Sequence, residues 1–225
     1  AEIKVVAGPE KKSRVISQHE RELTAWHEAG HAVVMHLLPD HDPVTRITII
    51  PRGQAGGMTI ALPEEDRSYL SKGYMEDQIV ALLGGRTAEE LCLGDISTGA
   101  SNDIQRATQI ARKMVASYGM SERIGTVCFD SEEVFIGRTM AQGRSYSETV
   151  AAEIDEEIKR VVGEAGARCR HLLETHRAQL DAVANYLLQH ETMEREEFVA
   201  VFDQPDAQKA EQPTDLPAEK QEPSL

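Results

Sequence analysis

The stretch AWHEAGHAVV, residues 25–34, places two histidines one helical turn apart among small apolar side chains. Apolar residues recur at helical spacing through residues 21–38, which predicts a helix that ends at Pro39. On a helix, positions i and i+4 lie on the same face, so His27 and His31 can reach a single metal ion. Two neutral imidazole nitrogens are ligands that suit zinc.

Glu28 lies beside the first histidine, where its carboxylate can reach an open coordination position of such a metal. There it can hold a zinc-activated water, take its proton and pass that proton to the leaving amine of a cleaved peptide bond. The alternative interpretation is two surface histidines with a glutamate between them. The small apolar flanks favour the metal site, because a solvated helix face does not need them.

A third ligand must come from elsewhere in the chain. The extended pattern HExxHxxGxxH is excluded, because Val34 and Leu37 stand where it needs a glycine and a histidine. Asp103 follows the loop STGASN and opens a predicted helix, whose positive N-terminal end favours an ionised carboxylate. It could equally be no more than a helix cap. Glu89 and Glu90 are rivals, and a carboxylate near a ligating histidine often accepts its other N–H.

The rest of the chain is expected to be mainly α-helical with one small β-hairpin. The β-branched stretch over 44–51 and the shorter stretch over 58–62 are typical of two strands that flank a glycine-rich turn. A short helix is expected from an N-cap at Thr192 to Phe202, and a short strand over 126–129. Apolar periodicity predicts further helices. These cover residues 69–83, 86–93, 104–118, 147–173 and 177–189. Gly119 would end the helix over 104–118.

The composition limits the classes of function. The 225 residues include 38 acidic and 24 basic side chains, a net charge of −14, which argues against nucleic acid or an anionic membrane as the main partner. Three widely spaced cysteines exclude a disulfide framework and a cysteine-rich zinc site. No apolar run is long enough to span a bilayer.

A series of motifs extends the argument beyond single residues. AWHEAGHAVV, DPVTRITIIPRG, LPEED, LLGGRTAEEL, STGASNDIQRAT and ARKMVASYGMS occur in this order. Together they resemble the peptidase domain of the FtsH family, the membrane-anchored, ATP-dependent zinc metalloproteases of bacteria and their derived organelles. The resemblance covers roughly residues 8–202, and it implies a helical zinc metallopeptidase domain.

The resemblance also assigns roles to particular residues. It implies that His27, His31 and Asp103 hold one zinc ion per subunit, which favours a ligand over a cap at the aspartate. It implies that Glu28 is the catalytic residue. The glutamate of the family's GGRxAEE segment falls on Glu89. This residue is expected to accept a hydrogen bond from the second ring nitrogen of a ligating histidine.

Domain boundaries follow from the same comparison. Residues 1–20 resemble the segment that joins the family's ATPase module to its peptidase, and residues 21–202 are expected to form the metallopeptidase domain, with C-terminal helices over about 147–202. Residues 203–225 are acidic, rich in proline and without aromatic side chains, so a disordered tail is expected. The chain has no GxxxxGK[ST] phosphate-binding motif. ATP and Mg²⁺, and any membrane contact, would therefore act only through upstream segments missing from it.

The expected partners are unfolded polypeptides and further copies of the chain, in a ring that the resemblance implies to be a hexamer. The resemblance places the domain on the cytoplasmic side of the bacterial inner membrane, or on the matrix or stroma side in an organelle. Two other classes of function, a catalytically silent scaffold and a zinc hydrolase for small substrates, are disfavoured by the intact HExxH motif and by the extended strand.

The first predicted strand is the candidate binding site for substrate. An extended polypeptide could pair with its exposed edge through backbone hydrogen bonds, which suits a protease that accepts many sequences. An internal strand without a free edge is the alternative. The residues of this candidate substrate strand are Val44, Thr45, Arg46, Ile47, Thr48, Ile49 and Ile50.

Overall fold

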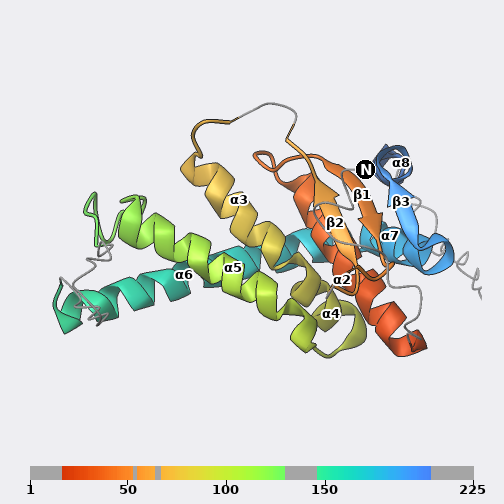
Figure 1. Ribbon diagram of the computed structural model, residues 1–225, viewed down its shortest axis with the longest axis horizontal. Coiled ribbons are helices and arrows are strands. Elements are labelled where there is room, and N and C mark those ends of the chain that lie inside the picture. The colour runs from red at the N-terminus through yellow and green to blue at the C-terminus, as the bar shows by residue number, and fades with distance from the viewer. Residues whose placement is uncertain (1–16, 53–54, 64–66, 130–145, 204–225) are drawn as a thin grey trace, which may run out of the picture.

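A computed structural model describes residues 17–52, 55–63, 67–129 and 146–203 of the chain. The described part is mainly α-helical with one small sheet, as the sequence predicts (Figure 1). The helices are α2 (Gln18–Leu37), α3 (Lys72–Leu82), α4 (Gly84–Leu93), α5 (Ser101–Arg112), α6 (Glu148–Thr175), α7 (Arg177–His190) and α8 (Arg195–Asp203). The strands are β1 (Val44–Thr48), β2 (Met58–Ala61) and β3 (Thr192–Glu194). Within the described ranges, no helix has both the length and the apolar character needed to cross a membrane.

The central helix α2 begins where the side chain of Ser17 accepts a hydrogen bond from the backbone N–H of Glu20. Its buried face is made of small residues, among them Ala25, Ala29 and Ala32, none of which has exposed surface. The helix therefore allows close neighbours, and it packs most extensively against α4 and also against α7 and the sheet. Figure 1 shows α2 behind β1 and β2, with α6 along the long axis of the molecule.

The sheet has the order β2-β1-β3, and both pairings are antiparallel. Ile47 of β1 lies opposite Thr59 on one side and opposite Met193 on the other. The prediction of an exposed edge on the stretch Val44–Ile50 is therefore wrong, because β3 occupies its second edge. In the described part of the chain, β2 pairs with β1 along one edge only, and its other edge is unpaired. This is the strand that contacts Glu28 of α2.

The predicted helix N-cap at Thr192 is also wrong, because this residue belongs to β3. That residue lies in the strand, where its hydroxyl is 3.0 Å from the hydroxyl of Thr48, and the last helix begins at Arg195. A strand of three residues is too short to produce a readable alternation of polar and apolar positions. The third strand of the sheet, β3, therefore comes from a segment that lies far from β1 in sequence.

Smaller differences concern the ends of elements. Helix α3 begins at Lys72 rather than Tyr69, because Ser71 caps it, and residues 126–129 form no strand. Helix α5 is followed by a π-helical turn, Lys113–Ser117, and Gly119 then adopts a left-handed backbone, which confirms the expected end of the helical segment. The proposed linker and tail lie mostly outside the described residues. At their inner ends, residues 18–20 belong to α2 and residue 203 to α8.

The contact between α2 and α4 depends on two glycines. A Cβ atom added at Gly30 would lie 2.4 Å from the carbonyl oxygen of Gly84, and one added at Gly84 would lie 2.8 Å from the carbonyl oxygen of Gly30. The two backbones therefore approach more closely than any side chain would permit. This approach brings the histidine face of α2 against the helix that carries Glu89.

We predict that Gly30→Ala destabilises the protein by about 1–3 kcal/mol, because the added methyl group forces the two helices apart. The matched control is Gly163→Ala in α6, where an added Cβ would meet nothing within 4 Å. That change is expected to stabilise the helix by about 0.5–1 kcal/mol, through helix propensity alone. Urea unfolding of both variants checks the prediction, and equal midpoints for Gly30→Ala and the parent would contradict it.

Candidate metal centre

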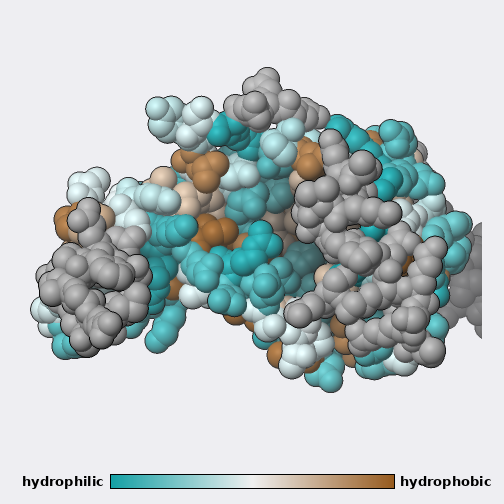
Figure 2. Space-filling view, in the orientation of Figure 1, coloured by the Kyte–Doolittle hydropathy of each residue, from teal (hydrophilic) through white to brown (hydrophobic). Residues whose placement is uncertain are grey.

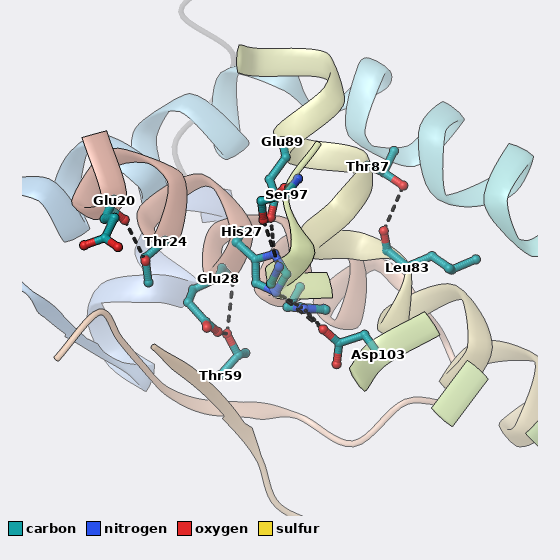
Figure 3. Close-up of polar contacts among 12 residues, drawn as sticks. Glu20, Thr24, His27, Glu28, Thr59, Leu83, Thr87, Glu89, Ser97 and Asp103 are labelled. Carbon is teal, nitrogen blue, oxygen red and sulfur yellow. Dashed lines mark hydrogen bonds and ion pairs between the residues drawn. The ribbon is translucent and has the colours of Figure 1, made fainter. Parts of the chain in front are cut away.

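Three polar side chains from two helices converge at one point. Figure 3 labels two of them, His27 and Asp103. His27 and His31 lie one turn apart on α2, and Asp103 lies in the first turn of α5. The two histidine Nε2 atoms are 3.1 Å apart, and Oδ2 of Asp103 is 3.5 Å from each of them. In the described part of the chain, no other group of three or more histidine, cysteine or acidic side chains is arranged to hold a metal.

These separations fit a tetrahedral zinc ion. With zinc–ligand bonds of about 2.0–2.1 Å, two ligand atoms at the tetrahedral angle are about 3.3 Å apart. The observed values of 3.1 Å and 3.5 Å lie on either side of that length. Three protein ligands leave one coordination position open, which is the arrangement of a catalytic rather than a structural zinc site.

The other ring nitrogens fix which atom of each histidine faces the centre. Nδ1 of His27 is 2.6 Å from Oε1 of Glu89, and Nδ1 of His31 is 2.8 Å from the carbonyl oxygen of Ala81. An ionised carboxylate and a carbonyl can only accept, so each Nδ1 donates its proton. Each Nε2 then carries a lone pair, which is the form that binds a metal.

Glu89 and Glu90, which sequence alone leaves as rivals, have different surroundings. Glu89 is fully buried, and its second oxygen accepts a hydrogen bond of 2.7 Å from the backbone N–H of Ser97. It therefore links α4 both to His27 and to the segment that leads into α5. Glu90 is exposed and pairs with Arg170 at 2.7 Å, away from the centre.

Asp103 does not cap its own helix. The residue before α5 is Ala100, and no side chain forms the N-terminal capping hydrogen bond there. The carboxylate lies instead 3.5 Å from Nε2 of each imidazole, and the aspartate is in the first turn, where the helix dipole favours its ionised form. This geometry supports a ligand rather than a cap.

The electrostatics of the cluster favour a bound cation. Burial lowers the pKa of His27, but hydrogen bonds to Asp103 and Glu89, with the charge of Glu28, outweigh it and raise that pKa to about 10. Burial raises the pKa of Asp103, but its hydrogen bonds to His27 and His31 outweigh that effect and hold the pKa well below the usual range. Without a metal, a proton takes the place of the cation among these groups.

Glu28 lies beside the centre on a cleft of about 740 Å³ that the three candidate ligands also line. Only 6% of its surface is exposed, and burial is the main reason that its pKa is raised. Its Oε2 accepts a hydrogen bond of 2.7 Å from the hydroxyl of Thr59. On the coloured part of the surface in Figure 2, hydrophilic residues are interspersed with smaller hydrophobic ones.

Sequence reasoning missed three parts of the site. The hydroxyl of Thr59 and the carbonyl of Ala81 carry no motif, because each acts through a tertiary contact. Gly85 is the third: a Cβ there would lie 2.5 Å from the ring of His27, so this glycine leaves room for the imidazole. Sequence showed only that two glycines precede the helix of Glu89.

Several known proteins with similar sequences are named ATP-dependent zinc metalloproteases. ATP-dependent zinc metalloprotease FtsH 1 of Thermoanaerobacter sp. (strain X514) is 58% identical over 201 residues, which cover 88% of this chain and 33% of that protein. ATP-dependent zinc metalloprotease FtsH of Caldicellulosiruptor bescii is 54% identical over 197 residues, or 87% of this chain and 32% of that protein. The Bacillus subtilis protein of the same name is 47% identical over 203 residues, or 89% and 32%.

This chain therefore spans about a third of the length of the curated relatives that it matches. A sequence model of peptidase family M41 matches residues 14–201, which include every residue of the metal centre. With that match over more than half of its length, the chain belongs to peptidase family M41.

Proposed function

We propose that this chain is a zinc-dependent endopeptidase that hydrolyses peptide bonds in unfolded polypeptides. The observation that carries the proposal is the tetrahedral spacing of His27, His31 and Asp103, with the carboxylate of Glu28 beside them in an open cleft. Membership of a peptidase family and the zinc metalloprotease names of the relatives support it.

His27, His31 and Asp103 would hold the zinc ion, and Glu89 would keep the first imidazole in its metal-binding form. Zinc, when bound, supplies Lewis-acid chemistry, which makes water a stronger nucleophile and polarises a carbonyl group. Glu28 would act as the general base: its carboxylate takes a proton from the attacking water. The protonated Glu28 then gives this proton to the leaving amine as the C–N bond breaks, so that the carboxylate is restored.

We propose the free edge of β2, rather than β1, as the place where substrate lies. The backbone N–H of Leu62 donates to the carbonyl of Pro43, and the carbonyl of Ile60 accepts from the side-chain hydroxyl of Thr45, so these two positions of β2 face β1. Because backbone direction alternates along a strand, Thr59 and Ala61 turn their N–H and C=O groups to the free edge. An extended peptide paired there would pass the carboxylate of Glu28.

We further propose that the full-length protein couples this hydrolysis to ATP. The relatives are named ATP-dependent proteases, and ATP and Mg²⁺ would bind in a module outside this chain. Assembly as a homohexamer, action on membrane proteins, and a position on the cytoplasmic side of the bacterial inner membrane, or the matrix or stroma side in an organelle, are extensions that rest on the resemblance to the FtsH family.

Glu28→Gln is expected to keep its zinc and to lose at least about 100-fold in peptide hydrolysis, because glutamine cannot accept the proton. The control is Glu90→Gln, an exposed glutamate on α4, which should cleave as the parent does. Metal analysis together with casein cleavage checks the prediction. Normal cleavage by zinc-loaded Glu28→Gln would refute the role of this carboxylate.

Asp103→Asn is expected to reduce zinc affinity more than Glu89→Gln. The first change removes the negative charge of a ligand, whereas the second weakens only the hydrogen bond that orients His27. The loss for Glu89→Gln should be about 10–100-fold. Asp155→Asn, on the exposed side of α6, is the control. Competition with a chromogenic chelator measures all three affinities. Parental affinity for Asp103→Asn would mean that the third ligand lies elsewhere.

Ala61→Pro is expected to weaken substrate binding, because proline removes an N–H from the free edge of β2 but no hydrogen bond to β1. One lost backbone hydrogen bond predicts a rise in KM of roughly tenfold. Ala61→Ser, which keeps the N–H, is the matched control. The measurement is KM for a fluorogenic peptide, and unchanged KM in the proline variant would exclude this edge as the binding site.

A further inference from the structure

We propose that Thr59 is a positioning residue that holds the carboxylate of Glu28 in the orientation needed for proton transfer. The inference rests on the proposed function and extends it to a residue on the strand opposite the HExxH helix. The hydroxyl of Thr59 is 2.7 Å from Oε2 of Glu28 and 3.1 Å from the backbone carbonyl oxygen of the same residue. Figure 3 shows the two side chains facing each other.

The hydrogen bond from Thr59 anchors this carboxylate. Among the residues that the structure describes, Thr59 is the only one whose side chain donates a hydrogen bond to Glu28. A glutamate side chain has three rotatable bonds, so without this bond its oxygens would be free to turn in the cleft. The bond fixes Oε2 and leaves Oε1 for a water molecule.

The backbone beside the carboxylate limits it from a second direction. A Cβ atom added at Gly57 would lie 2.8 Å from both Cγ and Oε1 of Glu28, and 2.8 Å from Cγ2 of Thr24. The start of the hairpin strand therefore passes in direct contact with the glutamate. Gly57 limits where the side chain can go, and Thr59 selects one orientation in that space.

Thr59 itself has a fixed position. It pairs with Ile47, a fully buried residue of the central strand, so the sheet determines where its side chain points. A hydroxyl also suits both states of Glu28, because it can donate to the carboxylate and can accept from the carboxylic acid while it donates to the backbone carbonyl. Serine could do the same, whereas valine, which has nearly the same shape, could not.

The test compares Thr59→Val and Thr59→Ser in the zinc-loaded protein. Thr59→Val should lower kcat about 10–100-fold with KM changed less than twofold, since ground-state binding is kept and only the reacting geometry is lost. Thr59→Ser should restore kcat to within about threefold of the parent. Thr192→Val removes a hydroxyl contact in the same sheet, far from the cleft, and should leave kcat unchanged.

Two further readouts separate positioning from a merely structural role. In a Glu28→Gln background, Thr59→Val should cause less than a twofold further loss, because its effect acts through the carboxylate. Crystal structures should show Glu28 reoriented or disordered in the valine variant and ordered in the serine variant. A kcat within twofold of the parent for Thr59→Val, or equal losses for valine and serine, would overturn the proposal.

Failure of this inference can be told apart from failure of the proposed function. If the zinc-loaded parent cleaves no unfolded peptide, the proteolytic function fails, whereas the orientation of Glu28 is still read from the crystal structures. If Thr59→Val loses zinc or unfolds, Thr59→Ser and Thr59→Ala decide the matter. Equal kcat values in those two variants would show that the hydroxyl does not matter.

Discussion

Three electron-pair donors directed at one point repel one another unless a positive charge lies among them, and the rest of this structure depends on that constraint. His27, His31 and Asp103 place their donor atoms 3.1–3.5 Å apart in a largely buried setting. Without a cation, a proton must take its place, which is the physical meaning of the raised pKa of His27. A metal that prefers nitrogen and oxygen ligands in a tetrahedron relieves the same repulsion and remains open to substrate.

The fold meets this constraint by bringing distant segments to the face of one helix. The Gly30–Gly84 contact lets α4 lie against α2, so that Glu89 can fix the ring of His27. Glu89 also accepts from Ser97, which ties the same carboxylate to the segment that leads to Asp103. On the other side of α2, the hairpin brings the hydroxyl of Thr59 to the carboxylate of Glu28. Loss of either glycine would therefore disturb chemistry as well as packing.

Sequence could predict the parts of the site that one helix supplies. The spacing of His27, Glu28 and His31 is a local property of α2, and helical periodicity alone predicts that the two histidines share one face. Without the resemblance, the residues alone leave Asp103 ambiguous, because a carboxylate near a helix start can be a cap or a ligand and only tertiary contacts separate the two. They likewise do not distinguish Glu89 from its neighbour Glu90. The free edge of the sheet is not predictable from the sequence for a similar reason: β3 has three residues, and its pairing with β1 joins positions nearly 150 residues apart in the chain.

The most direct test of the central claim is anomalous scattering at the zinc absorption edge from crystals of the zinc-loaded protein. The account predicts one zinc ion bound by Nε2 of His27, Nε2 of His31 and a carboxylate oxygen of Asp103, each at about 2.0–2.2 Å. Glu28 should lie beside the fourth position without binding the metal directly. An ion held without Asp103, or bound at a different group of side chains, would contradict the account.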